Sequence, residues 1–131
     1  MILGRRLAPA LPLAALAAIL VATVARAAAT PVATIRTGIQ PCAAVQGFGA
    51  VWVSVYGSAR LSRIDPATNR VTTSIPVGAS PCGLAIGAGS VWIDGYGTNT
   101  IERVNPTTLK RTRRIPVGIQ PYDVAFGFGS V

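Results

Sequence analysis

A repeat of forty residues constrains this chain more than any other feature. Residues 47–57 read GFGAVWVSVYG, residues 87–97 read GAGSVWIDGYG, and residues 127–131 begin the phrase again with GFGSV. The register needs no gap. A period of this length indicates similar units that stack, because one unit has too little core to stand alone. The aligned sets include Ile35, Ile75 and Ile115; Pro41, Pro81 and Pro121; Gly47, Gly87 and Gly127; Trp52 and Trp92; Arg63 and Arg103.

Each unit divides into four short runs that favour strands. In the second unit the turns between them carry Gly-Ala-Gly, Gly-Thr-Asn and Asn-Pro-Thr-Thr, and Asx-Pro opens a type I turn. Pro116 indicates that the fourth strand lies at an edge, since proline cannot donate to a central ladder. Four antiparallel strands in forty residues are typical of one β-propeller blade. The predicted strands of the second unit are residues 82–86, 90–96, 100–104 and 110–117.

The repeat therefore predicts an all-β fold, a β-propeller built from four-stranded antiparallel blades and incomplete in this chain. We expect an outer strand at 34–37, blades at 42–77 and 82–117, and the start of a third blade at 122–131. Two and a quarter blades cannot close a ring, and closure is what hides the sheet edges. The expected partners are the remaining blades of a longer protein or further copies of the chain. The end of the sequence inside a predicted strand favours the fragment.

The N-terminus has the layout of a secretory signal peptide over residues 1–27. A basic start with Arg5 and Arg6 precedes an apolar run, and Ala25-Arg26-Ala27 forms a small-residue cleavage site. Cleavage is expected after Ala27 or Ala29, which predicts a secreted or periplasmic protein without a retained membrane span. A retained anchor is the alternative, and Arg5-Arg6 leaves twin-arginine export open. Removal of residues 1–27 lowers the net charge from +8 to +5.

Three stretches of the sequence carry a resemblance to a known family. PCGLAIGAGSVWI at 81–93, RIDPATNRV at 63–71 and IPVG at 75–78 resemble the YVTN-type and virginiamycin B lyase-like β-propellers, over about residues 34–131. The resemblance implies an exported bacterial propeller. Its lyase members open the lactone of cyclic streptogramin antibiotics by elimination, with a divalent metal and a histidine.

The residue content of the chain separates the two functions that the resemblance implies. The chain contains no histidine, so the lyase's catalytic residue has no counterpart here. The leading expectation is a binding scaffold without a cofactor. The alternative is a truncated lyase-like enzyme whose site lies in further blades, and only that alternative calls for Mg²⁺.

Candidate ligand-binding residues gather at the expected mouth of the central channel. Tyr122-Asp123 replaces the Cys-Ala and Cys-Gly of the earlier copies, at the start of an innermost strand. The turns between second and third strands should emerge on the same face and give an aromatic rim for a ligand or a partner protein. The alternatives are repeat drift at 122–123 and tyrosine rings that pack over the blade ends. The candidates in or beside these turns are Tyr56, Tyr96, Arg60 and Asn99.

Cys42 and Cys82 occupy the same position in consecutive blades. An exported protein favours a disulfide. Equivalent side chains point the same way round a ring, however, which disfavours a bond unless both point toward the axis. Buried free thiols are the alternative, and two cysteines without histidine do not make a metal site.

The run Lys110-Arg111-Thr112-Arg113-Arg114 can attract phosphate or an anionic surface. Its counterpart at 70–74 carries a single charge, so the cluster is not a property of the repeat. We therefore interpret it as a solvated outer strand, and nucleic acid is not an expected partner.

Overall fold

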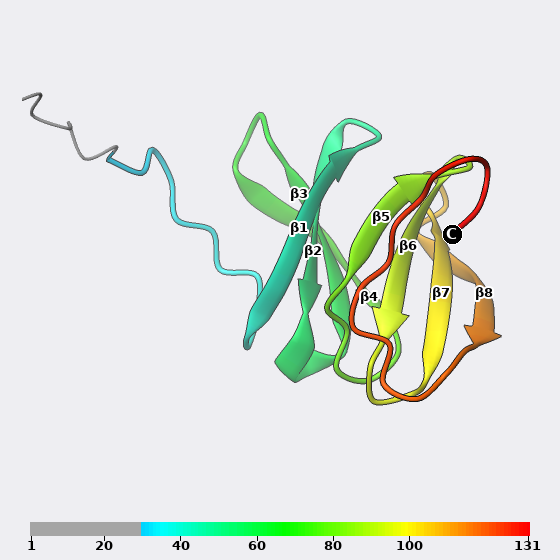
Figure 1. Cartoon of the computed structure of the whole chain (residues 1–131). Helices are drawn as coiled ribbons and strands as arrows, with labels where there is room; N and C mark the ends of the chain where they lie inside the picture. The colour runs from blue at the N-terminus through cyan, green and yellow to red at the C-terminus, as the bar shows by residue number, and fades with distance from the viewer. Residues whose placement is uncertain (1–29) are drawn as a thin grey trace, which may run out of the picture. The chain divides into compact units, whose positions relative to one another are not determined.

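The computed structural model describes residues 30–131, and the predicted signal peptide at 1–27 lies outside them. Two four-stranded antiparallel sheets follow each other, each with its strands side by side in chain order (Figure 1). Within residues 30–131 no helix is long and apolar enough to span a membrane. The predicted fold class, an all-β propeller with four-stranded blades, is confirmed. The strands are β1 (Pro41–Gly47), β2 (Ala50–Val55), β3 (Arg60–Asp65), β4 (Arg70–Pro76), β5 (Leu84–Gly87), β6 (Ser90–Gly95), β7 (Thr100–Asn105) and β8 (Lys110–Pro116).

The turns form as their residues predict. After β3, the Asp65 carboxylate accepts the Ala67 N–H at 2.9 Å and the Thr68 hydroxyl at 3.0 Å, and these bonds lower the pKa of Asp65. Asn105 does the same for Thr107 after β7, at 2.8 Å. Each turn thus returns the chain antiparallel into an edge strand, where a terminal proline costs no ladder bond.

The largest cluster of buried side chains lies between the two sheets. Trp52 and Leu61 from the first sheet meet Val91 and Ile93 from the second, and all four are fully buried. The indole N–H of Trp52 donates to the Gly47 carbonyl at 3.0 Å, so the ring buries its one polar atom with a partner. The repeated tryptophan therefore fills the space between blades, as the sequence predicts.

The second sheet buries its other face against the third repeat. Trp92, Ala85 and Ile101 form a second cluster, which Val124 and Phe126 cover. In Figure 1 this last segment of the chain runs alongside β5. All six residues of β6 are consequently buried, because that strand has neighbours on both faces.

Glycine at one repeat position permits this close stacking. A Cβ on Gly47 would meet the Ile86 side chain at 2.9 Å, and a Cβ on Gly87 would collide with the Phe126 ring. The first segment of each following repeat thus lies against a bare backbone.

Three predicted strands differ from the structure. No strand forms at 34–37, and at 122–131 only a single bridge joins Gly127 to Ser130. Neither segment finds a ladder partner among the described residues, and a strand needs one. The strand predicted at 82–86 begins two residues later, at Leu84, because the Cys82 N–H donates to the Asp94 side chain.

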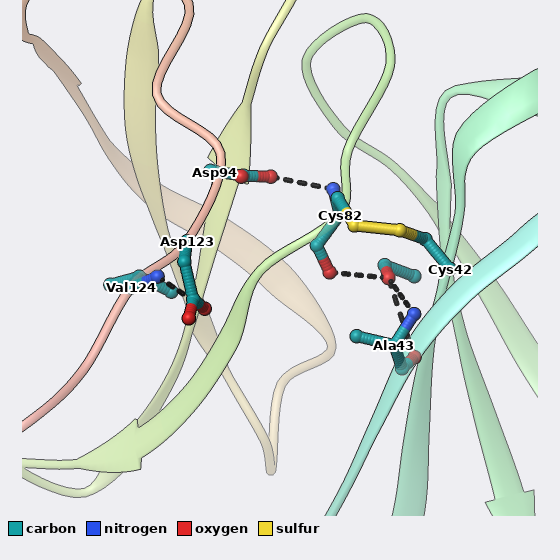
Figure 2. Close-up of a disulfide and its surroundings, with 7 residues drawn as sticks. Cys42, Ala43, Cys82, Asp94, Asp123 and Val124 are labelled. Carbon is teal, nitrogen blue, oxygen red and sulfur yellow. Dashed lines mark hydrogen bonds between the residues drawn. A yellow bond between two sulfur atoms is a disulfide. The ribbon is translucent and has the colours of Figure 1, made fainter.

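A disulfide joins the starts of β1 and β5 (Figure 2). Cys42 and Cys82 are bonded, with their Cα atoms 5.1 Å apart. The rotation between blades does not prevent this bond, contrary to the expectation from equivalent positions. The innermost strands β1 and β5 are in contact, so that equivalent positions lie within bonding distance.

We expect this disulfide to stabilise the pair of blades. It closes a loop of forty residues, and restricting the unfolded chain by such a loop contributes about 2–4 kcal/mol. The double variant Cys42→Ser/Cys82→Ser should lose that amount in urea unfolding, and reduction with dithiothreitol should shift the wild type equally. The double variant serves as the control, since dithiothreitol should not affect it. An unchanged midpoint on reduction would show that the bond contributes nothing.

Candidate functional site

Three tyrosines from three consecutive repeats stand in a row at one end of the sheets. The rings of Tyr56 and Tyr96 have centroids 6.5 Å apart, and those of Tyr96 and Tyr122 lie 6.1 Å apart, edge to face. Such tilted pairs are the favoured geometry for aromatic rings. Tyr122 remains 64% exposed at the end of the row. We refer to Tyr56, Tyr96 and Tyr122 as the tyrosine face.

Backbone hydrogen bonds hold the first two tyrosines in place. Tyr56 donates its N–H to the carbonyl of Gln40 at 2.9 Å, which ties the β2–β3 turn to the chain entering β1. The turn after Tyr96 is tied likewise, through the Gly97 N–H and the Ala79 carbonyl at 2.9 Å. Because Pro41 pairs with Val55, these turns and the disulfide share one end of the blades. The repeat therefore places Tyr56 and Tyr96, whereas Tyr122 joins the row from the position that Cys42 and Cys82 occupy in the earlier copies.

The other candidate residues have local roles at this end. Arg60 donates to the Ser74 carbonyl of β4 at 3.3 Å, toward the outer edge of its sheet. Asn99 accepts the N–H of Gln120 at 2.9 Å and so fixes the approach to the third repeat. Asp123 is exposed and accepts the N–H of Val124 at 2.8 Å. The structure thus brings the three tyrosines together, while Arg60 and Asn99 are engaged by neighbouring backbone.

A buried carboxylate lies beside the disulfide. Asp94 is fully buried in β6, and its Oδ1 accepts the Cys82 N–H at 2.6 Å (Figure 2). Its other oxygen, Oδ2, is buried and has no hydrogen-bond partner among residues 30–131. In that part of the chain it is the one buried side-chain oxygen or nitrogen of which this is true. Burial raises the pKa of the Asp94 carboxyl, the N–H groups of Cys82 and Gly83 oppose this, and the charge of Asp123 adds to it. A buried acid with an unsatisfied oxygen is a candidate functional group.

The basic strand β8 neutralises a second buried acid. Glu102 is fully buried in β7, and Arg114 and Arg111 contact its Oε1 at 2.7 Å and 3.3 Å. Its Oε2 accepts the Gly78 N–H at 3.1 Å. In the preceding repeat the same positions hold Ser62, Val71 and Ser74. Two of the arginines in the run 110–114 therefore have a structural role.

Comparison of the repeats could have identified both buried acids. Asp94 replaces Ser54, and Glu102 replaces Ser62, within strands that the repeat predicts. Glu102, Arg111 and Arg114 all appear in the second copy and not in the first, and this was the signal for the ion pairs. The positive charge of the run 110–114 was evident from the sequence, but Glu102 was not identified as its partner.

We expect the two arginines and Glu102 to be energetically coupled. The double variant Arg111→Val/Arg114→Ser should lose at least about 2 kcal/mol of unfolding free energy, because it leaves a buried carboxylate without its cations. Adding Glu102→Ser recreates the residues of the first blade and should restore most of the loss. A triple variant no more stable than the double variant would show that the ion pairs are not coupled.

Comparisons with known proteins agree with this geometry at the level of fold. No protein-family model matches the chain, and no curated protein matches it in sequence. Solved structures do match. Apo AztD from Citrobacter koseri superposes with a TM-score of 0.62 at 18% identity, covering 70% of this chain and 27% of that one.

Two further structures support the same conclusion. Hydrazine synthase from Kuenenia stuttgartiensis has a TM-score of 0.66 at 14% identity, covering 74% of this chain and 29% of that one. A streptogramin B lyase has a TM-score of 0.60 at 23% identity, covering 69% of this chain and 32% of that one. The matched part of this chain thus spans about a third or less of these structures. The chain has the β-propeller fold, with two four-stranded blades and the beginning of a third repeat.

Proposed function

We propose that this protein is an exported β-propeller that acts as a binding scaffold through its tyrosine face. The observation that carries the proposal is the row formed by Tyr56, Tyr96 and Tyr122, which joins three repeats at one end. Tyrosine offers an apolar ring and a polar hydroxyl at little entropic cost, and it is enriched where proteins bind partners. Exposure of Tyr122 leaves the end of the row accessible.

The surroundings support binding at this face. The disulfide and the backbone bonds of the turns fix the positions of Tyr56 and Tyr96, so that little freedom is lost on binding. The disulfide supports export, because disulfides persist in oxidising compartments outside the cytoplasm. The partner is a ligand or a protein that reaches the open end of the blades outside the cytoplasm.

Site-specific photocrosslinking tests this proposal. The photoreactive amino acid p-benzoylphenylalanine replaces Tyr122 in the full chain, which is expressed in the organism that encodes it and irradiated there. We expect a discrete covalent adduct, identified by mass spectrometry. Combining the probe with Tyr56→Ala should weaken the adduct, because the row then loses its first ring.

The matched control places the same probe at Phe128. That residue is aromatic, belongs to the same segment and is fully exposed, but it lies in the turn at the opposite end. Adducts of equal yield from both positions, or none from position 122, would contradict a binding role for the tyrosine face.

A lyase-like activity is the second candidate, favoured by the likeness to the streptogramin B lyase structure. In this reading the chain is part of a longer enzyme that opens a cyclic streptogramin lactone with Mg²⁺. The chain itself lacks histidine as a general base. We expect no ring opening when the purified chain is incubated with a streptogramin B and Mg²⁺. Mass spectrometry of the products checks this expectation. Turnover would replace the scaffold proposal with an enzymatic one.

A further inference from the structure

The unpartnered oxygen of Asp94 lies on the face of β6 that meets the third repeat. Successive side chains of a strand alternate between faces, so Asp94 shares its face with Trp92. Trp92 packs against Val124 and Phe126 of the third repeat. The Asp94 side chain is fully buried, although its Oδ2 has no hydrogen-bond partner among residues 30–131.

The first blade shows the hydrogen bonds that a side chain makes at the repeat position of Asp94. Ser54, the counterpart of Asp94, accepts the Ala43 N–H at 2.9 Å through its Oγ. The same hydroxyl donates to the carbonyl of Cys82 at 2.6 Å. This second bond joins the second strand of one blade to the first strand of the next repeat.

The third repeat stacks on the second blade as the second blade stacks on the first. The backbone of the third repeat lies directly against the second blade, since a Cβ on Gly83 would meet the Cα of Asp123 at 2.5 Å. Phe126 lies over Gly87 as Ile86 lies over Gly47. Ser54 bonds the carbonyl of Cys82 in the next repeat. Shifted by forty residues, the corresponding pair is Asp94 and the carbonyl of Tyr122.

A serine hydroxyl can donate to such a carbonyl at any pH, but a carboxyl group can do so only when it is protonated. We propose that Asp94 is a proton-dependent link between the second blade and the third repeat. When it takes a proton from solvent, its Oδ2–H donates to the backbone carbonyl of Tyr122. When it loses that proton, two acceptors oppose each other and the link is lost.

Burial, the largest effect, favours the protonated form of Asp94. The backbone N–H groups of Cys82 and Gly83, just before β5, act in the opposite direction, and the apolar Ile101 lies opposite on β7. The third repeat contributes the negative charge of Asp123, which raises the pKa of the Asp94 carboxyl in the same direction as burial. Because this pKa is raised from 3.8, the link stabilises the fold at low pH and is lost as pH rises through the raised value.

The link would set how firmly Tyr122 is held. Since Tyr122 forms the exposed end of the tyrosine face, protonation of Asp94 would order that end, and deprotonation would release it. This consequence for binding rests on the proposed function, whereas the hydrogen bond itself does not. Its test therefore uses no ligand, so that its failure and the failure of the scaffold proposal are distinguishable.

The test follows the backbone carbonyl of Tyr122 by NMR. The chain is labelled with carbonyl ¹³C in tyrosine and titrated from about pH 3.5 to about pH 8. Asp123→Asn forms the background of every sample, because the adjacent carboxylate would otherwise shift the same signal. The asparagine can still accept the Val124 N–H. We expect the Tyr122 signal to titrate, and Tyr56 to serve as the reference.

Asp94→Asn is the decisive variant, because its amide donates permanently. In the Asp123→Asn/Asp94→Asn protein the Tyr122 signal should stay constant at the position that the single variant reaches at low pH. A Tyr122 signal that titrates in both proteins, or in neither, would overturn the proposal.

Stability supplies a second readout on otherwise wild-type chains. Relative to Asp94→Asn, the unfolding equilibrium constant of the wild type should rise roughly threefold to tenfold between low and neutral pH, the effect of one hydrogen bond. Ser54→Ala removes the corresponding bond of the first blade and should destabilise the protein equally at every pH. A wild type and an Asp94→Asn variant with parallel pH profiles would also overturn the proposal.

Discussion

Burial of one blade's face against the next repeat is the constraint on which the rest of the structure depends. Trp52 and Leu61 on one sheet are covered by Val91 and Ile93 on the other, and each large apolar side chain contributes roughly 1.5–3 kcal/mol when it is buried. No single sheet of four short strands could provide that cover for itself. The same packing fixes where each first strand begins, and so where each turn emerges. The tyrosine face is therefore a product of blade stacking.

Two differences between the repeats introduce buried acids at positions that hold serine in the first blade. Glu102 in place of Ser62 adds a buried charge, which is tolerated because Arg111 and Arg114 appear in the same copy. The exchange converts a neutral contact into an ion-paired one without changing the backbone. The repeat thus preserves geometry, while individual positions within it acquire new chemistry.

The period of forty residues was sufficient to predict the blades, because turn residues and strand residues recur in fixed order. The first two rings of the aromatic row were also predictable, since Tyr56 and Tyr96 occupy one repeat position in equivalent turns. The state of Cys42 and Cys82 was not, because it depends on how closely β1 approaches β5, which the sequence does not encode locally. The roles of Asp94 and Glu102 likewise arise from contacts between repeats. The strands expected at 34–37 and 122–131 are absent from the structure because no ladder partner lies beside them.

The two buried acids of the second blade differ in the groups that surround their carboxylates. Glu102 has a backbone N–H from Gly78 and two arginines, so its charge is compensated on the side facing the first blade. Among residues 30–131, Asp94 has no cation in salt-bridge contact, and one of its oxygens has no hydrogen-bond partner. Burial without a compensating cation raises the pKa of the Asp94 carboxyl above its ordinary value. The third repeat, which carries Tyr122, therefore meets the blade through the acid whose charge can change.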